Sequence, residues 1–356
     1  MKDSGAGSIG RRNMLFGAGA LGSGLLLSAC TSNSTDDGAD QAGVTADRPA
    51  AGSAGTPGKH VTIGFSAPAA DHGWMAAITK NAKAQAGRYT DVSFQAAEGT
   101  NDVNAQISAV QTLIDRKVDV LVVLPFDGKA LTSIGAQAMD ADIPVVNLDR
   151  VFDNSLAYRT WIGGDNYGMG VNAGQYIVRT LKAKGVGKPV IAEIAGIDNL
   201  DLTKQRSQGF KDALAKAGFS VSIRQAAQFT ADSGQQVMSN VLQARSKLDA
   251  VWNHDDDQGI GVEAAVKQAG RSEFFMVGGA GSKHAMQQIK ADSGVLKATV
   301  VYPSSMSASA ITLARLIGQG KGVGDLVEQE VPTSITLFSA TVTKDNVDQY
   351  LPTSFT

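Results

Sequence analysis

The chain has 356 residues, a formal net charge of -2 and 19% charged residues. Proteins that bind nucleic acid by neutralising phosphates concentrate Lys and Arg and usually have a basic isoelectric point, so this near-neutral balance argues against nucleic acid as a partner. A single cysteine excludes an intramolecular disulfide and the thiolate-rich zinc and iron-sulfur sites, which need several Cys residues. At roughly 100 to 200 residues per domain, the length predicts two domains.

Residues 1–29 have the pattern of an export signal peptide. Arg11 and Arg12 precede an uncharged stretch, 14–29, that is too short to cross a bilayer, since a spanning helix needs about 20 apolar residues. The run Arg-Arg-Asn-Met-Leu resembles the twin-arginine export motif, although Met14 stands where that motif prefers Phe. Export by the twin-arginine route and export by the general secretory route both stay open.

Cys30 closes a Leu-Ser-Ala-Cys run that resembles a bacterial lipobox, in which the Cys thiol is lipidated and becomes the first mature residue. The alternative is a general secretory signal with an incidental Cys. Residues 31–58 contain one branched apolar residue, Val44, so they cannot bury enough surface to offset the entropy of ordering. We therefore expect residues 30–58 to be a lipidated Cys and a flexible tether that hold a soluble body at the outer face of the bacterial cytoplasmic membrane.

From residue 59 onward, short apolar runs alternate with longer amphipathic segments, as is typical of parallel sheets with crossover helices. We expect strands at 61–66, 92–96, 120–124, 145–148, 189–194, 220–224, 249–253, 274–278 and 297–302. We expect helices near 75–88, 103–114, 129–140, 167–183, 204–217, 233–246, 257–269, 283–291 and 305–318. So many strands predict two doubly wound α/β lobes, in which ligands bind beyond the carboxyl ends of the strands.

Polar and aromatic residues gather at those strand ends. Four of the expected strands are followed by such residues: His72 and Trp74, then Asp149 and Arg150, then the run His254-Asp255-Asp256-Asp257, and finally Tyr302. Because the carboxyl ends of parallel strands meet at one edge of a sheet, these side chains predict a cleft lined by polar and aromatic groups.

Several of these segments resemble the sugar-binding proteins of bacterial ABC importers. The resemblance is carried by Ile-Pro-Val-Val-Asn-Leu-Asp-Arg at 143–150, Asp165-Asn166, Gln-Arg-Ser-Gln-Gly-Phe at 205–210, Phe229 and the run at 254–257, and it covers nearly all of residues 60–350. It points to the ribose and galactofuranose type, with the type I periplasmic-binding fold. That fold has two similar lobes that close over ligand like a hinge, joined here by crossings near 163, 303 and 333. The resemblance thus implies an N-terminal lobe of 59–163 plus 303–333 and a C-terminal lobe of 164–302 plus 334–356.

Carried over position by position, the family's ligand contacts fall on ten residues: His72, Trp74, Met75, Asp149, Arg150, Arg206, Phe229, Asp255, Ala280 and Tyr302. A sugar or polyol offers apolar C–H faces and a set of hydroxyls. Trp74 and Phe229 would supply flat apolar surfaces. The carboxylates would accept hydroxyl protons, and the guanidinium groups would donate to oxygens at fixed places.

Seven of these positions also have a structural alternative. Asp149 and Arg150 would form a surface ion pair at a strand end, and Trp74 would close the core over the first helix. Met75 and Tyr302 would be packing residues. Arg206 would belong to a solvated helix face that also carries Lys204 and Lys211, and His72 would be exposed.

Three departures from the ribose type argue for another ligand. A Gly-Gly-Ala-Gly-Ser run at 278–282 stands where the ribose type has a second-lobe Asp, Tyr302 stands where it has Gln, and Asp255 stands where it usually has Asn. These changes remove one acceptor, add an aromatic wall and add a charge. We therefore expect a different monosaccharide, a linear polyol or a related small hydroxylated molecule.

Nothing in the sequence predicts catalysis, a cofactor or a metal. The G-x-S-x-G, H-E-x-x-H and Walker A motifs are absent, and the four His residues have no triad-like spacing. Asp149 and Asp255 would make a glycosidase pair, but the flanking arginines would hold both ionised and leave no acid. Consecutive carboxylates at 255–257 cannot all face one ion.

The sequence therefore predicts a monomeric, lipid-anchored solute-binding protein that delivers a sugar or polyol to the membrane permease of an ABC importer. The alternative is a sensory protein of the same fold that presents its ligand to a membrane receptor or kinase. A sugar-responsive repressor would need a helix-turn-helix ahead of the body, where this chain has an export signal and a tether instead.

Overall fold

A computed structural model of the protein describes residues 56–324 and 326–356. The expected signal peptide, Cys30 and all but the last few residues of the tether lie outside the described residues. No helix in the described part of the chain combines the length and the apolar character that a membrane span requires.

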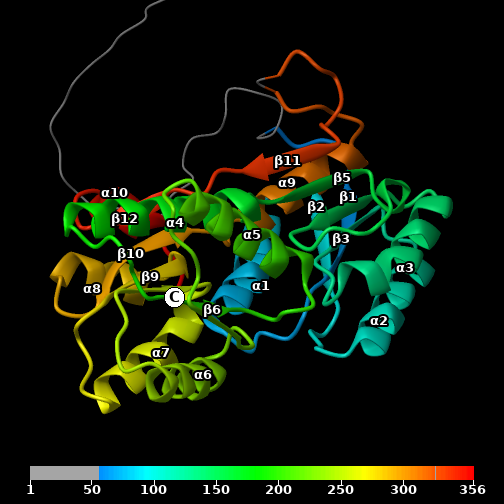
Figure 1. Ribbon diagram of the computed structural model, residues 1–356. Coiled ribbons are helices and arrows are strands. Elements are labelled where there is room, and N and C mark those ends of the chain that lie inside the picture. Colours follow the sequence, from blue (N-terminus) through cyan, green and yellow to red (C-terminus); the bar gives the residue numbers. More distant parts are fainter. Residues whose placement is uncertain (1–55, 325) are drawn as a thin grey trace, which may run out of the picture. The chain divides into compact units, whose positions relative to one another are not determined.

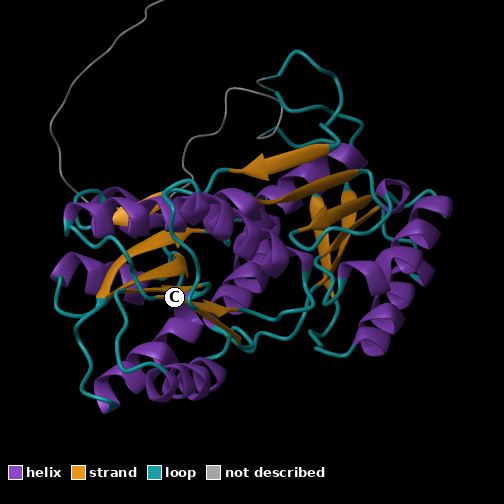
Figure 2. Cartoon of the chain, viewed as in Figure 1, coloured by secondary structure: helices purple, strands orange, loops and turns teal. Residues whose placement is uncertain are grey.

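The first lobe is built on a six-stranded parallel sheet with the order β11-β5-β4-β3-β1-β2 (Figures 1 and 2). Its strands are β1 (Val61–Ser66), β2 (Val92–Ala96), β3 (Val120–Val123), β4 (Val145–Leu148), β5 (Thr160–Gly164) and β11 (Ser334–Leu337). Its helices are α1 (Gly73–Ala86), α2 (Val103–Asp115), α3 (Gly128–Asp140) and α9 (Met306–Gly318), with a short 3-10 turn at Ser155–Ala157.

Both faces of this sheet are covered, which explains the continuous apolar run of β3. Val120 and Val122 join the core formed with α1 and α9, whereas Leu121 and Val123 join the core formed with α2 and α3. Successive side chains of a strand point to opposite faces, so a strand buried on both sides needs no polar positions.

The second lobe repeats the arrangement with the order β12-β10-β9-β8-β6-β7, in which only β12 is antiparallel. Its strands are β6 (Ile191–Ala195), β7 (Ile223–Ala226), β8 (Ala250–Asn253), β9 (Phe275–Ala280), β10 (Leu296–Val301) and β12 (Thr341–Thr343). Its helices are α4 (Asn166–Ala183), α5 (Asp201–Ala215), α6 (Ala231–Ala244), α7 (Asp256–Gln268), α8 (Lys283–Ala291) and α10 (Val347–Tyr350), followed by a 3-10 turn at Leu351–Thr353. Two lobes of parallel sheet with covering helices confirm the predicted fold class.

Three segments connect the two sheets. The first runs from β5 into α4 and the second from β10 into α9, near the expected positions. The third runs from Leu337 to Thr341, later than the expected 333, because β11 pairs with β5 through Ser334 opposite Trp161. Residues 334–337 therefore belong to the first sheet and not to the C-terminal lobe.

Several helices begin with a side-chain cap of their own, but two helices that face the cleft do not. Asp127, Asp165 and Asp255 each accept a hydrogen bond from an N–H group in the first turn of the helix that follows, as capping residues commonly do. Helix α1 begins after His72 and helix α5 begins after Leu200, and neither residue makes a side-chain cap bond. The first turns of α1 and α5 thus keep N–H groups available for partners from elsewhere.

Candidate binding site

A small cavity lies where the carboxyl ends of the strands of both sheets meet. It is lined by His72, Trp74, Asp149, Arg150, Leu202, Arg206, Phe229, Asp255, Ala280 and Tyr302. Nine of the ten residues expected to contact ligand are thus brought together, from both lobes. The tenth, Met75, lies in the first turn of α1, is 1% exposed and packs in the core rather than in the cavity.

Leu202 is the lining residue that the sequence did not suggest. It lies in the first turn of α5, four positions before Arg206, so both side chains are on the same face of that helix. This i, i+4 spacing is the signal that identifies it once Arg206 is placed in the cleft.

Tyr302 occupies the centre of the site. Its hydroxyl donates a hydrogen bond to Asp149 Oδ1 at 2.5 Å and accepts one from Asn166 Nδ2 at 3.1 Å. The guanidinium of Arg206 lies over the phenol ring, 4.6 Å from its centroid, and Trp74 Nε1 donates to the Tyr302 carbonyl at 3.0 Å. Burial, followed by the charge of Asp149, raises the pKa of Tyr302 far above its ordinary value, so the phenol remains a proton donor.

The phenol ring leaves little free space around it. The remaining cavity volume is about 20 Å³, which is enough for roughly one water molecule. Gly164 on β5 makes room for the ring, since a Cβ there would lie 2.1 Å from Tyr302 Cε2. The lobes are therefore closed on a site that Tyr302 largely fills.

Three of the lining residues hold a strained backbone. Asp149, Phe229 and Ala280 have φ values of 62°, 64° and 80°, in the left-handed region that favours glycine. For Phe and Ala such a conformation is costly and persists only where the surrounding structure enforces it, which is common at functional sites. Phe229 is further fitted against Gly196, where a Cβ would lie 1.9 Å from the ring.

The acidic run 255–257 divides into three different roles. Asp255 lines the cavity and caps α7 by accepting from the Asp257 and Gln258 N–H groups at 2.8 and 3.2 Å. Burial, followed by the charges of its two acidic neighbours, raises the pKa of Asp255 well above its usual range. Asp256, which begins α7, accepts hydrogen bonds from the N–H groups of Gly279, Gly281 and Ser282. In place of the carboxylate of the ribose type, the glycine-rich segment thus encloses a buried carboxylate from α7.

Asp257 reaches across to the first lobe. Its Oδ2 accepts a hydrogen bond from the Trp74 N–H at 2.8 Å, at the start of α1. Gly73 allows this approach, because a Cβ there would lie 2.7 Å from Asp257 Oδ1. Since α1 has no side-chain cap of its own, a carboxylate of the second lobe takes that role. The interaction exists only while the lobes are together.

A buried pair of titratable groups lies behind the second-lobe face of the cavity. His254 Nε2 is 3.1 Å from Glu193 Oε1, and both side chains are 0% exposed. Arg206 Nη1 donates to the main-chain carbonyl of His254 at 3.3 Å, and the hydroxyl of its neighbour Ser207 donates to Glu193 Oε1, so the pair lies directly against the part of α5 that lines the cavity. Burial lowers the pKa of His254 below its ordinary value, which keeps the ring neutral at pH 7.

No group of three or more His, Cys, Asp or Glu side chains in the described ranges has the arrangement that would hold a metal ion. The chemistry available at the cavity consists of hydroxyl, carboxylate and guanidinium groups together with aromatic faces. This combination suits recognition of a neutral, hydroxyl-rich molecule.

Comparison with known proteins places these features in a family. The model of a periplasmic binding protein domain matches residues 63–322. The chain is 32% identical over 218 residues to the galactofuranose-binding protein YtfQ of Escherichia coli, covering 59% of this chain and 67% of that protein. It is 29% identical over 266 residues to the ribose import binding protein RbsB of Bacillus subtilis, covering 74% and 84%.

A solved structure is also similar to this chain in fold and in sequence. The fructose-binding periplasmic domain of the hybrid two-component system BT1754 matches with a TM-score of 0.72 and 27% identity, over 82% of this chain and 93% of that one. The family model covers well over half of the chain, and the family consists of solute-binding proteins and not of enzymes, as the sequence predicted. The chain therefore belongs to the periplasmic binding protein family.

Proposed function

We propose that this protein is an extracytoplasmic receptor that binds a monosaccharide or a polyol between its lobes and delivers it to the membrane permease of an ABC importer. The observation that carries the proposal is the cavity itself, because residues from seven separate segments of both lobes converge there. Relatives named for galactofuranose binding and ribose import support a sugar as the ligand class.

Polar groups of the cavity have hydrogen-bonding capacity left for a ligand. Arg150 Nη1 donates to the Phe126 carbonyl at 2.6 Å, whereas its buried Nε has no partner among the described residues. An unpaired buried donor costs about 1 to 3 kcal/mol, so an acceptor oxygen on a ligand would be stabilised there. Asp149 offers a carboxylate beside it, which suits a hydroxyl proton.

Tyr302 argues against ribose in this proposal. The ring fills volume that a ligand would otherwise take, and its hydroxyl already satisfies one oxygen of Asp149. The ligand must therefore differ from ribose in shape or enter with a displacement of this ring. Contacts across the cleft, such as His72 with Phe229 at 6.4 Å between ring centroids, would be made on closure, and a ligand that adds contacts to both lobes favours that state.

Lipid anchoring through Cys30 forms part of the proposal and is tested separately. The lipobox-like run 27–30 is its only support. We expect a Cys30→Ser chain, expressed in its bacterial host, to move from the membrane fraction to the soluble fraction. Mass spectrometry of the wild-type chain should find a lipidated N-terminal Cys; an unmodified mature N-terminus elsewhere would contradict the anchor.

The second candidate is a sensory receptor, because one similar structure is the periplasmic domain of a two-component system. The two candidates differ in what the ligand-bound protein contacts. Reconstitution with a permease and its ATPase should give ligand-dependent ATP hydrolysis if the protein serves an importer. Ligand-dependent activation of a histidine kinase in place of this would favour the sensor.

The ligand class is tested by a thermal-shift screen of the protein against pentoses, hexoses, inositols and linear polyols. A specific ligand should raise the melting temperature, and the shift should grow with the logarithm of ligand concentration above Kd, because the ligand binds the folded state alone. Tight binding of ribose with no response to other sugars or to polyols would contradict the ligand preference. No response to any hydroxylated compound would contradict the function.

A further inference from the structure

A second and much larger cavity adjoins the first. Its volume is about 450 Å³, which lies in the range of small-molecule pockets, roughly 300 to 1,000 Å³. Asp149, Arg150 and Leu202 line both cavities, so the two spaces meet at these residues. Apart from Asp149 and Arg150, none of the ten positions expected to contact ligand lines this second cavity.

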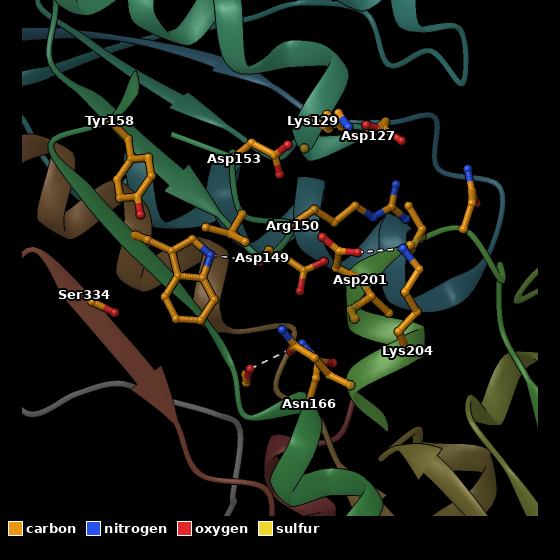
Figure 3. Close-up of a pocket in the computed structure, with 18 residues that line it drawn as sticks. Asp127, Lys129, Asp149, Arg150, Asp153, Tyr158, Asn166, Asp201, Lys204 and Ser334 are labelled. Carbon is orange, nitrogen blue, oxygen red and sulfur yellow. Dashed lines mark hydrogen bonds and ion pairs between the residues drawn. The ribbon is translucent and has the colours of Figure 1, made fainter. Parts of the chain in front are cut away.

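Residues of both lobes line the second cavity, and those of the first lobe include residues of β5 (Figure 3). Figure 3 shows Tyr158 and Asp153 on one side and Asp201 and Lys204, on α5, on another. The indole of Trp161 also lines the cavity, and its Nε1 donates to the Asp149 carbonyl at 2.9 Å, which fixes the ring edge. Trp161 and Tyr158 are half-buried aromatic surfaces of the kind that pack against the C–H face of a sugar.

The charges of this cavity do not favour an anion. Four carboxylates line it against three cationic groups, and three of the carboxylates already have partners, among them Asp149 with the Tyr302 hydroxyl. Asp127 accepts from the Ala130 N–H at the start of α3, and Asp201 pairs with Lys204 at 2.8 Å. A phosphate or carboxylate group would meet repulsion here, whereas a neutral group with several hydroxyls would find both donors and acceptors.

The two volumes together suggest the shape of the ligand. The first cavity has room for about one water in the closed form, while the second stays open in the same form. A ligand held only by the predicted residues would leave the larger space empty. We propose that the protein binds an elongated ligand, a disaccharide or other glycoside, whose second unit occupies the cavity walled by Trp161 and Tyr158. This inference rests on the proposed sugar-binding function, and it extends the single sugar or polyol unit of that proposal by a second unit.

The experiment compares matched ligands by calorimetric titration of the protein: galactose with melibiose, fructose with sucrose, and myo-inositol with galactinol. The inference predicts that one extended compound binds at least about tenfold more tightly than its single-unit partner. Asn199→Trp, in an exposed part of the second cavity wall, should remove that difference while single-unit binding is unchanged. Asn240→Trp, on the exposed face of α6 in the same lobe, is the matched control and should preserve the difference.

The outcomes separate this inference from the proposed function. Binding of single units without any gain for the extended compounds overturns the inference and leaves the proposed function intact. A gain that survives Asn199→Trp also overturns it, because the second unit then lies elsewhere. If none of the single-unit compounds and none of the extended compounds binds, the proposed function and the inference are both overturned.

Discussion

Each lobe buries a pair of titratable side chains, Asp91 with Arg315 in the first lobe and Glu193 with His254 in the second, and the two pairs are built differently. In the first lobe, Arg315 contacts both carboxylate oxygens of Asp91 at 2.7 and 2.6 Å, and Asp91 also accepts from the Gly58 N–H and from Gln319. In the second lobe, Glu193 Oε2 and His254 Nδ1 have no hydrogen-bond partner among the described residues. Both oxygens of the Asp91 carboxylate are therefore paired, although Gln319 Oε1 beside it is not, whereas both side chains of the second pair carry an unpaired atom.

Their positions differ as well. Asp91 precedes β2, at the amino end of its sheet, away from the cavity, whereas His254 follows β8 at the carboxyl end and supports Arg206. Buried polar groups are normally satisfied, and exceptions concentrate at functional sites. The difference indicates that the first pair stabilises the fold and that the second positions the binding site. Variants of the first pair should therefore change stability, and variants of the second pair should change ligand affinity.

Removing the first-lobe cation should destabilise the protein without affecting the site. Arg315→Met leaves the Asp91 carboxylate buried without its counter-charge, which typically costs about 3 to 5 kcal/mol. Denaturant unfolding should show this loss, while the Kd of the folded protein for its ligand is unchanged. Arg159→Met is the control, because its pair with Glu330 is largely exposed and is worth at most about 1 kcal/mol.

The pair of Asp91 and Arg315 also predicts that the free energy of unfolding depends on pH. The hydrogen bond from Arg315, which outweighs the opposing effect of burial, holds the pKa of Asp91 well below its ordinary value. The stabilisation is therefore fully present above the unfolded-state pKa, about 3.9, and is lost as the pH falls below it toward the folded-state pKa. Unfolding of wild type and Asp91→Asn should differ most above pH 5 and converge in acid. A constant difference across this range would contradict the assignment.

Altering the second-lobe pair should weaken ligand binding and have a smaller effect on stability. Glu193→Gln keeps the shape of the side chain but removes the charge that holds His254 and Arg224. We expect roughly 5- to 10-fold weaker ligand binding, about 1 kcal/mol, because Glu193 also accepts from the hydroxyl of Ser207, the neighbour of Arg206 on α5, and that bond loses its charged acceptor. The free energy of unfolding should change less than in Arg315→Met. Equal losses of stability with unchanged affinity would remove the distinction between the two pairs.

The smallest predicted effect concerns closure of the lobes. Asp257→Asn weakens the cap that the second lobe provides for α1, an interaction worth about 0.5 to 1 kcal/mol. Affinity should fall about 2- to 5-fold, and small-angle scattering of the unliganded protein should show a larger radius of gyration. Asp232→Asn, in the first turn of α6, removes a similar charge within one lobe and should change neither quantity.

Much of the fold follows from the sequence because most strands are short segments rich in apolar residues. The expected β1, β2 and β4 agree with the structure at both ends. The sequence Thr-Trp-Ile-Gly-Gly of β5 is not such a segment, and this strand forms because β4 and β11 pair with it on either side. The edge strand β7, Ile-Arg-Gln-Ala, begins at 223 and not at 220, since an exposed edge places little constraint on register.

The site was predictable where residues follow strand ends, and less so where lobes meet. His72, Asp149 and Asp255 were placed in the cleft by their positions after β1, β4 and β8. The hydrogen bond of Tyr302 to Asp149 joins residues 153 positions apart, and that of Asp257 to Trp74 joins residues 183 apart. Such contacts depend on how two lobes close, which no local pattern in the sequence encodes.

In the proposed function, Asp149 and Arg206 bind a hydroxylated ligand between the lobes. Calorimetric titration of wild type, Asp149→Asn and Arg206→Met with the compound selected in the screen measures the contribution of each side chain. Asn tolerates the left-handed backbone of position 149, so the first variant changes the charge alone. We predict that each variant keeps the melting behaviour of the unliganded protein within a few degrees and binds at least about 100-fold more weakly, a loss of roughly 3 kcal/mol. Wild-type affinity in both variants would contradict the account.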